Sequence, residues 1–132
     1  ATSSKGTALA SSDVYQCLSI PAESVILHAG LQVTEVLTGT SSDTGYDLGI
    51  TGGDVDNFVD GFDADGASAL AYAPTSAAYA PVLVSAADTL DILVAAQTGT
   101  TLTGKIRVFA TLMDISDAGD MAANEVDRDT LA

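Results

Sequence analysis

Apolar and polar residues alternate with a period of two through much of this chain, and such alternation is typical of β-strands that are buried on one side. The pattern predicts strands at residues 14–20, which Pro21 ends, and across residues 25–36. In the second stretch one face is formed by Val25, Leu27, Ala29, Leu31 and Val33. Gly30 lies in its middle, and an internal glycine often marks a bend or bulge. We therefore expect two consecutive strands there instead of one.

The clearest pair of strands is predicted at residues 89–96 and 105–112. The apolar faces are formed by Leu90, Ile92, Val94 and Ala96 in the first run and by Ile106, Val108, Ala110 and Leu112 in the second. A Gly- and Thr-rich stretch at 97–104 separates them, and two alternating runs around such a loop predict a hairpin. In antiparallel register Asp91 would face Lys105 or Arg107 on the solvent side, a contact worth only ~0.2–1 kcal/mol.

The remaining segments complete an all-β chain. Residues 46–50 predict a short strand, and the Ala-rich residues 67–81, interrupted by two prolines, predict an irregular connection with short strands. Seven or eight short strands without a clear helix predict an antiparallel β-sandwich, with a jelly roll as the specific expectation. We place the sandwich domain at residues 13–114. Extended arms flank it: an N-terminal arm at 1–12 and an acidic C-terminal arm at 115–132, where a weak helix capped by Asp120 is the alternative.

Charge narrows the choice of partners. The chain carries 18 acidic against 4 basic residues, a net charge of −14. Nucleic acids and anionic membranes are therefore not expected as partners, because binding them requires cationic side chains. The acidic residues concentrate in residues 43–66 and 113–132, whereas 67–112 is neutral. The N-terminus has no apolar signal core and no run approaches the ~18 apolar residues of a membrane span, so we expect synthesis in the cytoplasm without export.

Catalytic chemistry is not predicted. A nucleophilic triad needs a histidine base, and His28, the single histidine, lies on an alternating strand. Zinc needs several His or Cys ligands, but the chain has one of each. Cys17 alternates with Tyr15 and Ser19, which favours a buried structural thiol. Paired carboxylates for glycoside hydrolysis exist, but the aromatic platforms of sugar sites are scarce in a chain without Trp. We therefore expect a protein that is not an enzyme.

One segment stands out for its acidic residues. After Gly52-Gly53, five aspartates follow within residues 54–65: Asp54, Asp56, Asp60, Asp63 and Asp65. Three interpretations remain open: a hydrated surface loop, a structural Ca²⁺ site and a surface for assembly. Calcium takes six to eight oxygen ligands from flexible loops, although the EF-hand pattern is not matched. Phe58, Val59 and Phe62 are expected to anchor the segment to the core.

Several short sequence segments spread through the chain carry a resemblance to a known family. They are the residues at 13–22 (DVYQCLSIPA), 46–49 (YDLG), 53–61 (GDVDNFVDG), 89–92 (TLDI) and 104–110 (GKIRVFA). Together they resemble the small β-sandwich structural proteins of tailed-phage virions, notably those of marine phages and cyanophages, which decorate or cement the head. The similarity covers roughly residues 12–114.

The resemblance implies a non-enzymatic protein on the exterior of the virion head, made in the host cytoplasm. It further implies a homo-oligomer, expected to be a trimer, that binds the major capsid protein through a terminal arm. Two other classes remain open. One is a phage fibre, spike or receptor-binding β-domain, and the other is a cation-stabilised carbohydrate-binding module.

Overall fold

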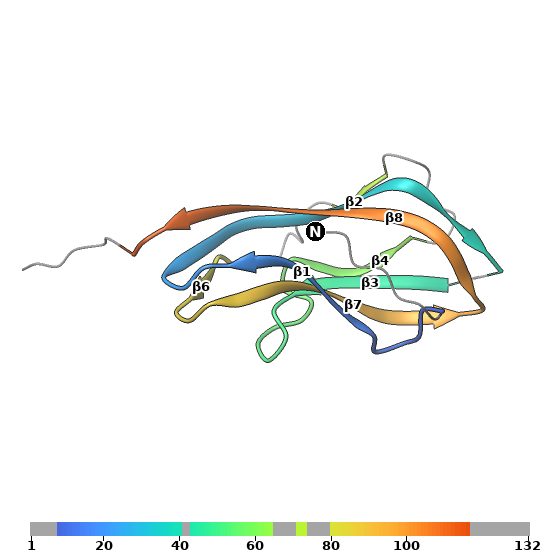
Figure 1. The fold of residues 1–132 in the computed structure, drawn as a ribbon, viewed down its shortest axis with the longest axis horizontal. Coiled ribbons are helices and arrows are strands. Elements are labelled where there is room, and N and C mark those ends of the chain that lie inside the picture. Colours follow the sequence, from blue (N-terminus) through green and yellow to red (C-terminus); the bar gives the residue numbers. More distant parts are fainter. Residues whose placement is uncertain (1–7, 41–42, 65–70, 74–79, 117–132) are drawn as a thin grey trace, which may run out of the picture.

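The computed structural model describes residues 8–40, 43–64, 71–73 and 80–116, and every regular element in these ranges is a β-strand (Figure 1). The strands are β1 (Val14–Ile20), β2 (Ser24–Gly39), β3 (Asp43–Gly49), β4 (Val59–Asp63), β5 (Tyr72–Ala73), β6 (Val82–Val84), β7 (Asp88–Thr98) and β8 (Thr101–Asp114). All pairings among them are antiparallel. The predicted all-β class is confirmed.

Two sheets lie face to face and form a β-sandwich (Figure 1). Sheet A has the strand order β1-β7-β3-β4. In sheet B the long strand β2 pairs with β8 along one edge and with β5 and β6 along the other. The specific connectivity of a jelly roll stays a prediction.

The core lies between the sheets and consists mainly of aliphatic side chains. Those with no exposed surface include Ile26, Leu31 and Val33 from β2, Leu48 from β3, and Leu90 and Val94 from β7. From β8 the half-buried Ile106, Val108 and Ala110 pack against this cluster, as their alternation predicted. Branched aliphatic side chains fit such pleated, closely packed surfaces.

The predicted hairpin between residues 89–96 and 105–112 is wrong. Both runs are strands, but β7 belongs to sheet A and β8 to sheet B, so the short turn around Gly99 carries the chain from one sheet to the other. Alternation reveals that one face of each strand is buried, but it does not reveal whether the two faces lie side by side or oppose each other. Here they oppose each other across the core. Asp91 consequently lies far from the predicted partner Lys105, whose neighbour is Glu35 on β2.

The predicted division of residues 25–36 into two strands is also wrong, because β2 is continuous from Ser24 to Gly39. Gly30 is needed instead for close packing: a Cβ there would lie 2.5 Å from the Phe109 ring and 2.8 Å from the Ala73 carbonyl oxygen. The pairing of β2 with β8 shifts register at four places, none of them at Gly30, and the first lies between Ile26 and His28. Before it Ile26 points inward, so that Ile26 joins the core with Ala29, Leu31 and Val33, in place of the predicted Val25 and Leu27.

Each predicted arm lies partly within the described residues, at 8–12 and at 115–116. Around residues 8–13 the chain follows β7: the Ser12 amide donates to the Val94 carbonyl oxygen at 2.8 Å, and the Gln97 amide donates to Ser11 Oγ at 3.1 Å. Leu9 packs against the core. At the other end the Ile115 amide donates to the Glu23 carbonyl oxygen at 2.9 Å. Residues 1–7 and 117–132 lie outside the described residues, and so does the helix or tail predicted at 117–128.

The buried Tyr46 predicts a loss of stability at alkaline pH. Burial, with the nearby Tyr15 as the smaller cause, raises the pKa of the Tyr46 phenol to about 12. In the unfolded chain a tyrosine ionises near pH ~10. Because the folded pKa is the higher one, the stabilising effect is complete below the unfolded value and is lost as pH rises from about 10 through 12.

Urea unfolding at pH 8 and pH 11 checks this expectation in the wild type and in Tyr46→Phe. The free energy of unfolding should fall more between the two pH values in the wild type than in the variant. An equal fall in both proteins would show that Tyr46 is not responsible.

Candidate functional site

The acidic segment connects β3 to β4 and lies on the outer side of sheet A. In Figure 1 it is the green loop that extends away from the sandwich below β7. Two turns begin it, with the Ile50 amide donating to the Asp54 carbonyl oxygen and the Gly53 amide to the Ile50 carbonyl oxygen, both at 3.0 Å. Its far end is held by Phe58, which has no exposed surface, and by the buried Val59. Together with the half-buried Phe62 they confirm the predicted anchors.

The acidic side chains of this loop and of the following β4 are exposed where the structure describes them, namely at Asp54, Asp56, Asp60 and Asp63. Asp65 lies outside the described residues. Asp54 and Asp56 come together: a hydrogen bond to the Asp54 carboxylate stabilises the protonated form of Asp56 and thereby raises the pKa of Asp56. Among the described residues, no group of three or more His, Cys, Asp or Glu side chains is placed to hold a metal ion. The five-aspartate Ca²⁺ site stays a prediction.

Two other carboxylates are buried on the same side of sheet A. Asp47 on β3 is 7% exposed and Asp91 on β7 is 3% exposed. Asp47 Oδ1 accepts a hydrogen bond from the Gly61 amide at 2.7 Å. Asp91 Oδ2 accepts the Thr51 hydroxyl at 2.6 Å, whereas its Oδ1 is buried and has no hydrogen-bond partner. The predicted position of Asp91 in solvent, opposite a base, is therefore wrong.

The loop covers Asp91 because glycine permits a close approach. Gly49 is the cross-strand neighbour of Asp91 and lies on the same outer face. A Cβ at Gly49 would lie 2.1 Å from the Asp54 carbonyl oxygen and 2.6 Å from the Val55 carbonyl oxygen. The loop backbone therefore lies directly on the sheet beside Asp91. Alternation marks Asp47 and Asp91 as outward positions. Their burial depends on segments that contact them from elsewhere, the loop at Asp91 and Gly61 of β4 at Asp47.

The outer face of sheet B carries an aromatic pair. The rings of His28 and Phe109 stack with centroids 5.9 Å apart and an interplanar angle of 27°. The Phe109 ring also covers Gly30. Beside them Arg107 Nη1 donates to Gln32 Oε1 at 3.5 Å, while Lys105 forms an ion pair with Glu35. The half-exposed strand position predicted for His28 is confirmed.

An apolar row crosses one end of the same face. Val25 on β2 is paired with Leu83 on β6 and with Met113 on β8. Leu83 is 61% exposed and Met113 is 46% exposed. Three apolar neighbours on three adjacent strands form a continuous strip, which we call the apolar row. Contiguous exposed apolar surface is a mark of protein contact sites.

Cys17 is half-buried, and its thiol donates to the Tyr15 carbonyl oxygen at 3.2 Å. Burial is the main reason why the pKa of this thiol is raised, and the charge of the nearby Asp91 adds to it. Because the thiolate is the reactive form, this environment supports the predicted structural role.

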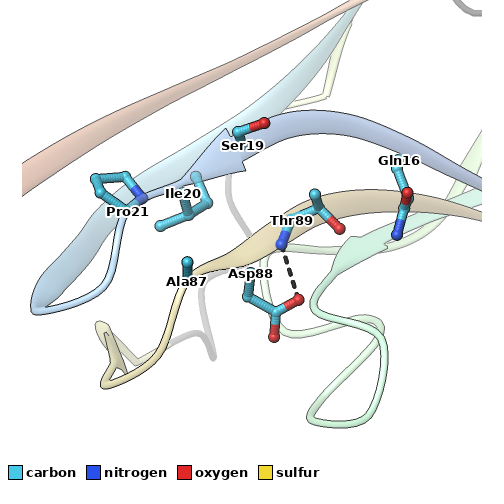
Figure 2. Close-up of a pocket in the computed structure, with 7 residues that line it drawn as sticks. All are labelled: Gln16, Ser19, Ile20, Pro21, Ala87, Asp88 and Thr89. Atoms are coloured by element: carbon cyan, nitrogen blue, oxygen red, sulfur yellow. Dashed lines mark hydrogen bonds between the residues drawn. The ribbon is translucent and has the colours of Figure 1, made fainter.

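An open groove of about 530 Å³ lies between the start of β7 and the end of β1. Figure 2 shows its lining: Gln16, Ser19, Ile20, Pro21, Ala87, Asp88 and Thr89. The Asp88 carboxylate accepts a hydrogen bond from the Thr89 amide at 2.8 Å, so part of its hydrogen-bonding capacity is used within its own strand. The groove brings together no pair of groups suited to acid–base or nucleophilic chemistry.

Comparison with known proteins returned no matching family model, no matching curated protein and no matching solved structure. Among the described residues, the structure contains no helix long and apolar enough to cross a membrane.

Proposed function

We propose that this protein is a structural component of a tailed-phage virion, made in the host cytoplasm, that decorates the exterior of the head. In this role it binds the major capsid protein and stabilises the shell as a homo-oligomer, with a trimer as the expected form. It carries out no reaction.

The observation that carries the proposal is the presence of two different contact surfaces on one small β-sandwich. The apolar row lies on the outer face of sheet B. The acidic loop lies on the outer side of sheet A, at the opposite side of the sandwich. A cementing protein needs one surface for its own copies and another for the shell. Burial of the apolar row suits contact between copies, and the charge of the loop suits a basic surface on the shell.

Binding to purified empty heads tests this function. We expect the protein to sediment with heads at a constant number of copies per shell and to raise their melting temperature. Leu83→Glu should lower occupancy roughly tenfold, the equivalent of about 1.4 kcal/mol. Val36→Glu is the matched control, because Val36 is also exposed but lies outside the apolar row.

Deletions test the predicted role of the arms without touching the described fold. Removal of residues 1–7 or 117–132 spares the bonds of Ser11, Ser12 and Ile115. We expect at least one deletion to weaken head binding while the thermal melt stays that of the wild type. Unchanged occupancy after both deletions would contradict an arm-mediated contact. Isolation of the protein with fibres instead of heads would overturn the decoration role.

A receptor- or carbohydrate-binding β-domain is the second candidate, and the aromatic pair on sheet B favours it. The Phe109 ring lies on the sheet over Gly30, with Arg107 and Gln32 beside it. Aromatic surfaces next to polar groups are typical of small-ligand sites. On this alternative a glycan array gives a signal that Phe109→Ala removes and Leu83→Glu leaves intact. Absence of any glycan signal would eliminate it.

A further inference from the structure

Asp91 is a buried carboxylate whose charge the described protein groups do not balance. Its Oδ2 accepts a hydrogen bond from Thr51, and its Oδ1 is buried without a partner. Among the described residues no Lys, Arg or His forms an ion pair with it. Asp47, also buried, lies on the same face one step along the adjacent strand. A buried charge is costly unless it is paired or coordinates a metal.

Several oxygen atoms lie around Asp91, in addition to the nearby Cys17 thiol. The Thr51 hydroxyl contacts its carboxylate directly. The carbonyl oxygens of Asp54 and Val55 lie over Gly49, the cross-strand neighbour of Asp91. On the other side Gln16 of β1 is paired with Asp91 and adds an amide to the same outer face. Carboxylate, hydroxyl, amide and main-chain carbonyl oxygens are the ligands that hard cations prefer.

We propose that Asp91, with Thr51 and the loop carbonyl groups above Gly49, forms a Ca²⁺ site between sheet A and the β3–β4 loop. The site differs from the five-aspartate set, because its central ligand comes from a strand and is buried. The exposed pair of Asp54 and Asp56 adds negative potential at the loop. Calcium suits the site better than magnesium, since it accepts irregular geometry and carbonyl ligands, with water completing its shell. The cation would fasten the loop to the sheet.

Calcium titration of the full chain tests this site. The protein is first treated with EDTA, and the Kd for CaCl₂ is measured by calorimetry together with the melting temperature. We expect the melting temperature to rise at millimolar CaCl₂, because a ligand that binds only the folded state stabilises it. NaCl at matched ionic strength is the control for screening of the net charge of −14. An equal rise in NaCl would overturn the proposal.

Variants locate the cation. Asp91→Asn should weaken Ca²⁺ binding at least tenfold, whereas Asp88→Asn, an exposed position on the same strand, should bind like the wild type. Thr51→Val should also weaken binding, and because Thr51 is exposed this variant decides the matter if Asp91→Asn does not fold. Wild-type affinity in Thr51→Val and Asp91→Asn, with loss in Asp54→Asn or Asp56→Asn, would place the cation on the exposed aspartates and overturn the proposal.

Discussion

Phe58→Ala is expected to lower the free energy of unfolding by about 3–5 kcal/mol, the usual cost of truncating a fully buried phenylalanine. Phe58 has no exposed surface and ends the acidic loop immediately before β4. Its amide also donates to the Leu48 carbonyl oxygen at 3.0 Å, which fixes the backbone of the loop against β3. Truncation leaves a cavity in the core and removes the side chain that holds the loop in place.

Urea unfolding followed by circular dichroism measures this loss. Phe62→Ala is the matched control, because Phe62 belongs to the same segment but is only half-buried. We expect its cost to be clearly smaller, since less apolar surface returns to water. Equal costs for the two variants would mean that Phe58 is not the principal anchor.

Leu31→Asp is expected to cost more than about 4 kcal/mol and to leave little folded protein, because typical domains are stable by only ~5–15 kcal/mol. Leu31 has no exposed surface and lies on the inner face of β2, opposite Val108 of β8. A carboxylate there would be buried among aliphatic side chains without a partner. The fold offers no route by which the charge could reach solvent without separating the two sheets.

Gln32→Asp introduces the same residue one position later and is the control for this experiment. Gln32 lies on the outer face and accepts a hydrogen bond from Arg107, so an aspartate there gains an ion pair at the surface. We expect its unfolding free energy to stay within about 1 kcal/mol of the wild type. Similar melting curves for Leu31→Asp and Gln32→Asp would contradict the assigned faces of β2.

The period of two predicted β1, β7, β8 and parts of β2 and β3 with most of their inner faces, because burial of one side leaves its mark on every second residue. It predicted neither β4 nor β6, which are short. Leu90, Ile92 and Val94 are buried as that pattern requires, and Val108 faces the core from the other sheet. Strand partners depend on the direction of each turn, which the pattern does not record. For this reason β7 and β8 were placed in one hairpin although they belong to different sheets.

At the candidate site, too, the sequence predicts some features of the acidic loop and not others. Its anchors were predictable, because Phe58 and Val59 are apolar residues inside an acidic run and are buried in the structure. The buried carboxylate of Asp91 was not predictable, because an outward residue is buried only where another segment covers it. The covering segment is residues 54–55, and its backbone comes close to the sheet only because Gly49 lacks a side chain. Local pattern predicts faces, whereas coverage of a face depends on contacts between distant segments.

The pairing of β2 with β8 has a consequence for the order in which the chain folds. Leu31 meets Val108 in this ladder, so most of the chain must be synthesised before the longest pair of strands can form. Closure of so long a segment costs entropy before the pairing returns any stability, and domains dominated by such distant contacts fold slowly. A chain still emerging from the ribosome therefore presents β2 without its main partner, and completion of sheet B is a late event that depends on arrival of the C-terminal strand.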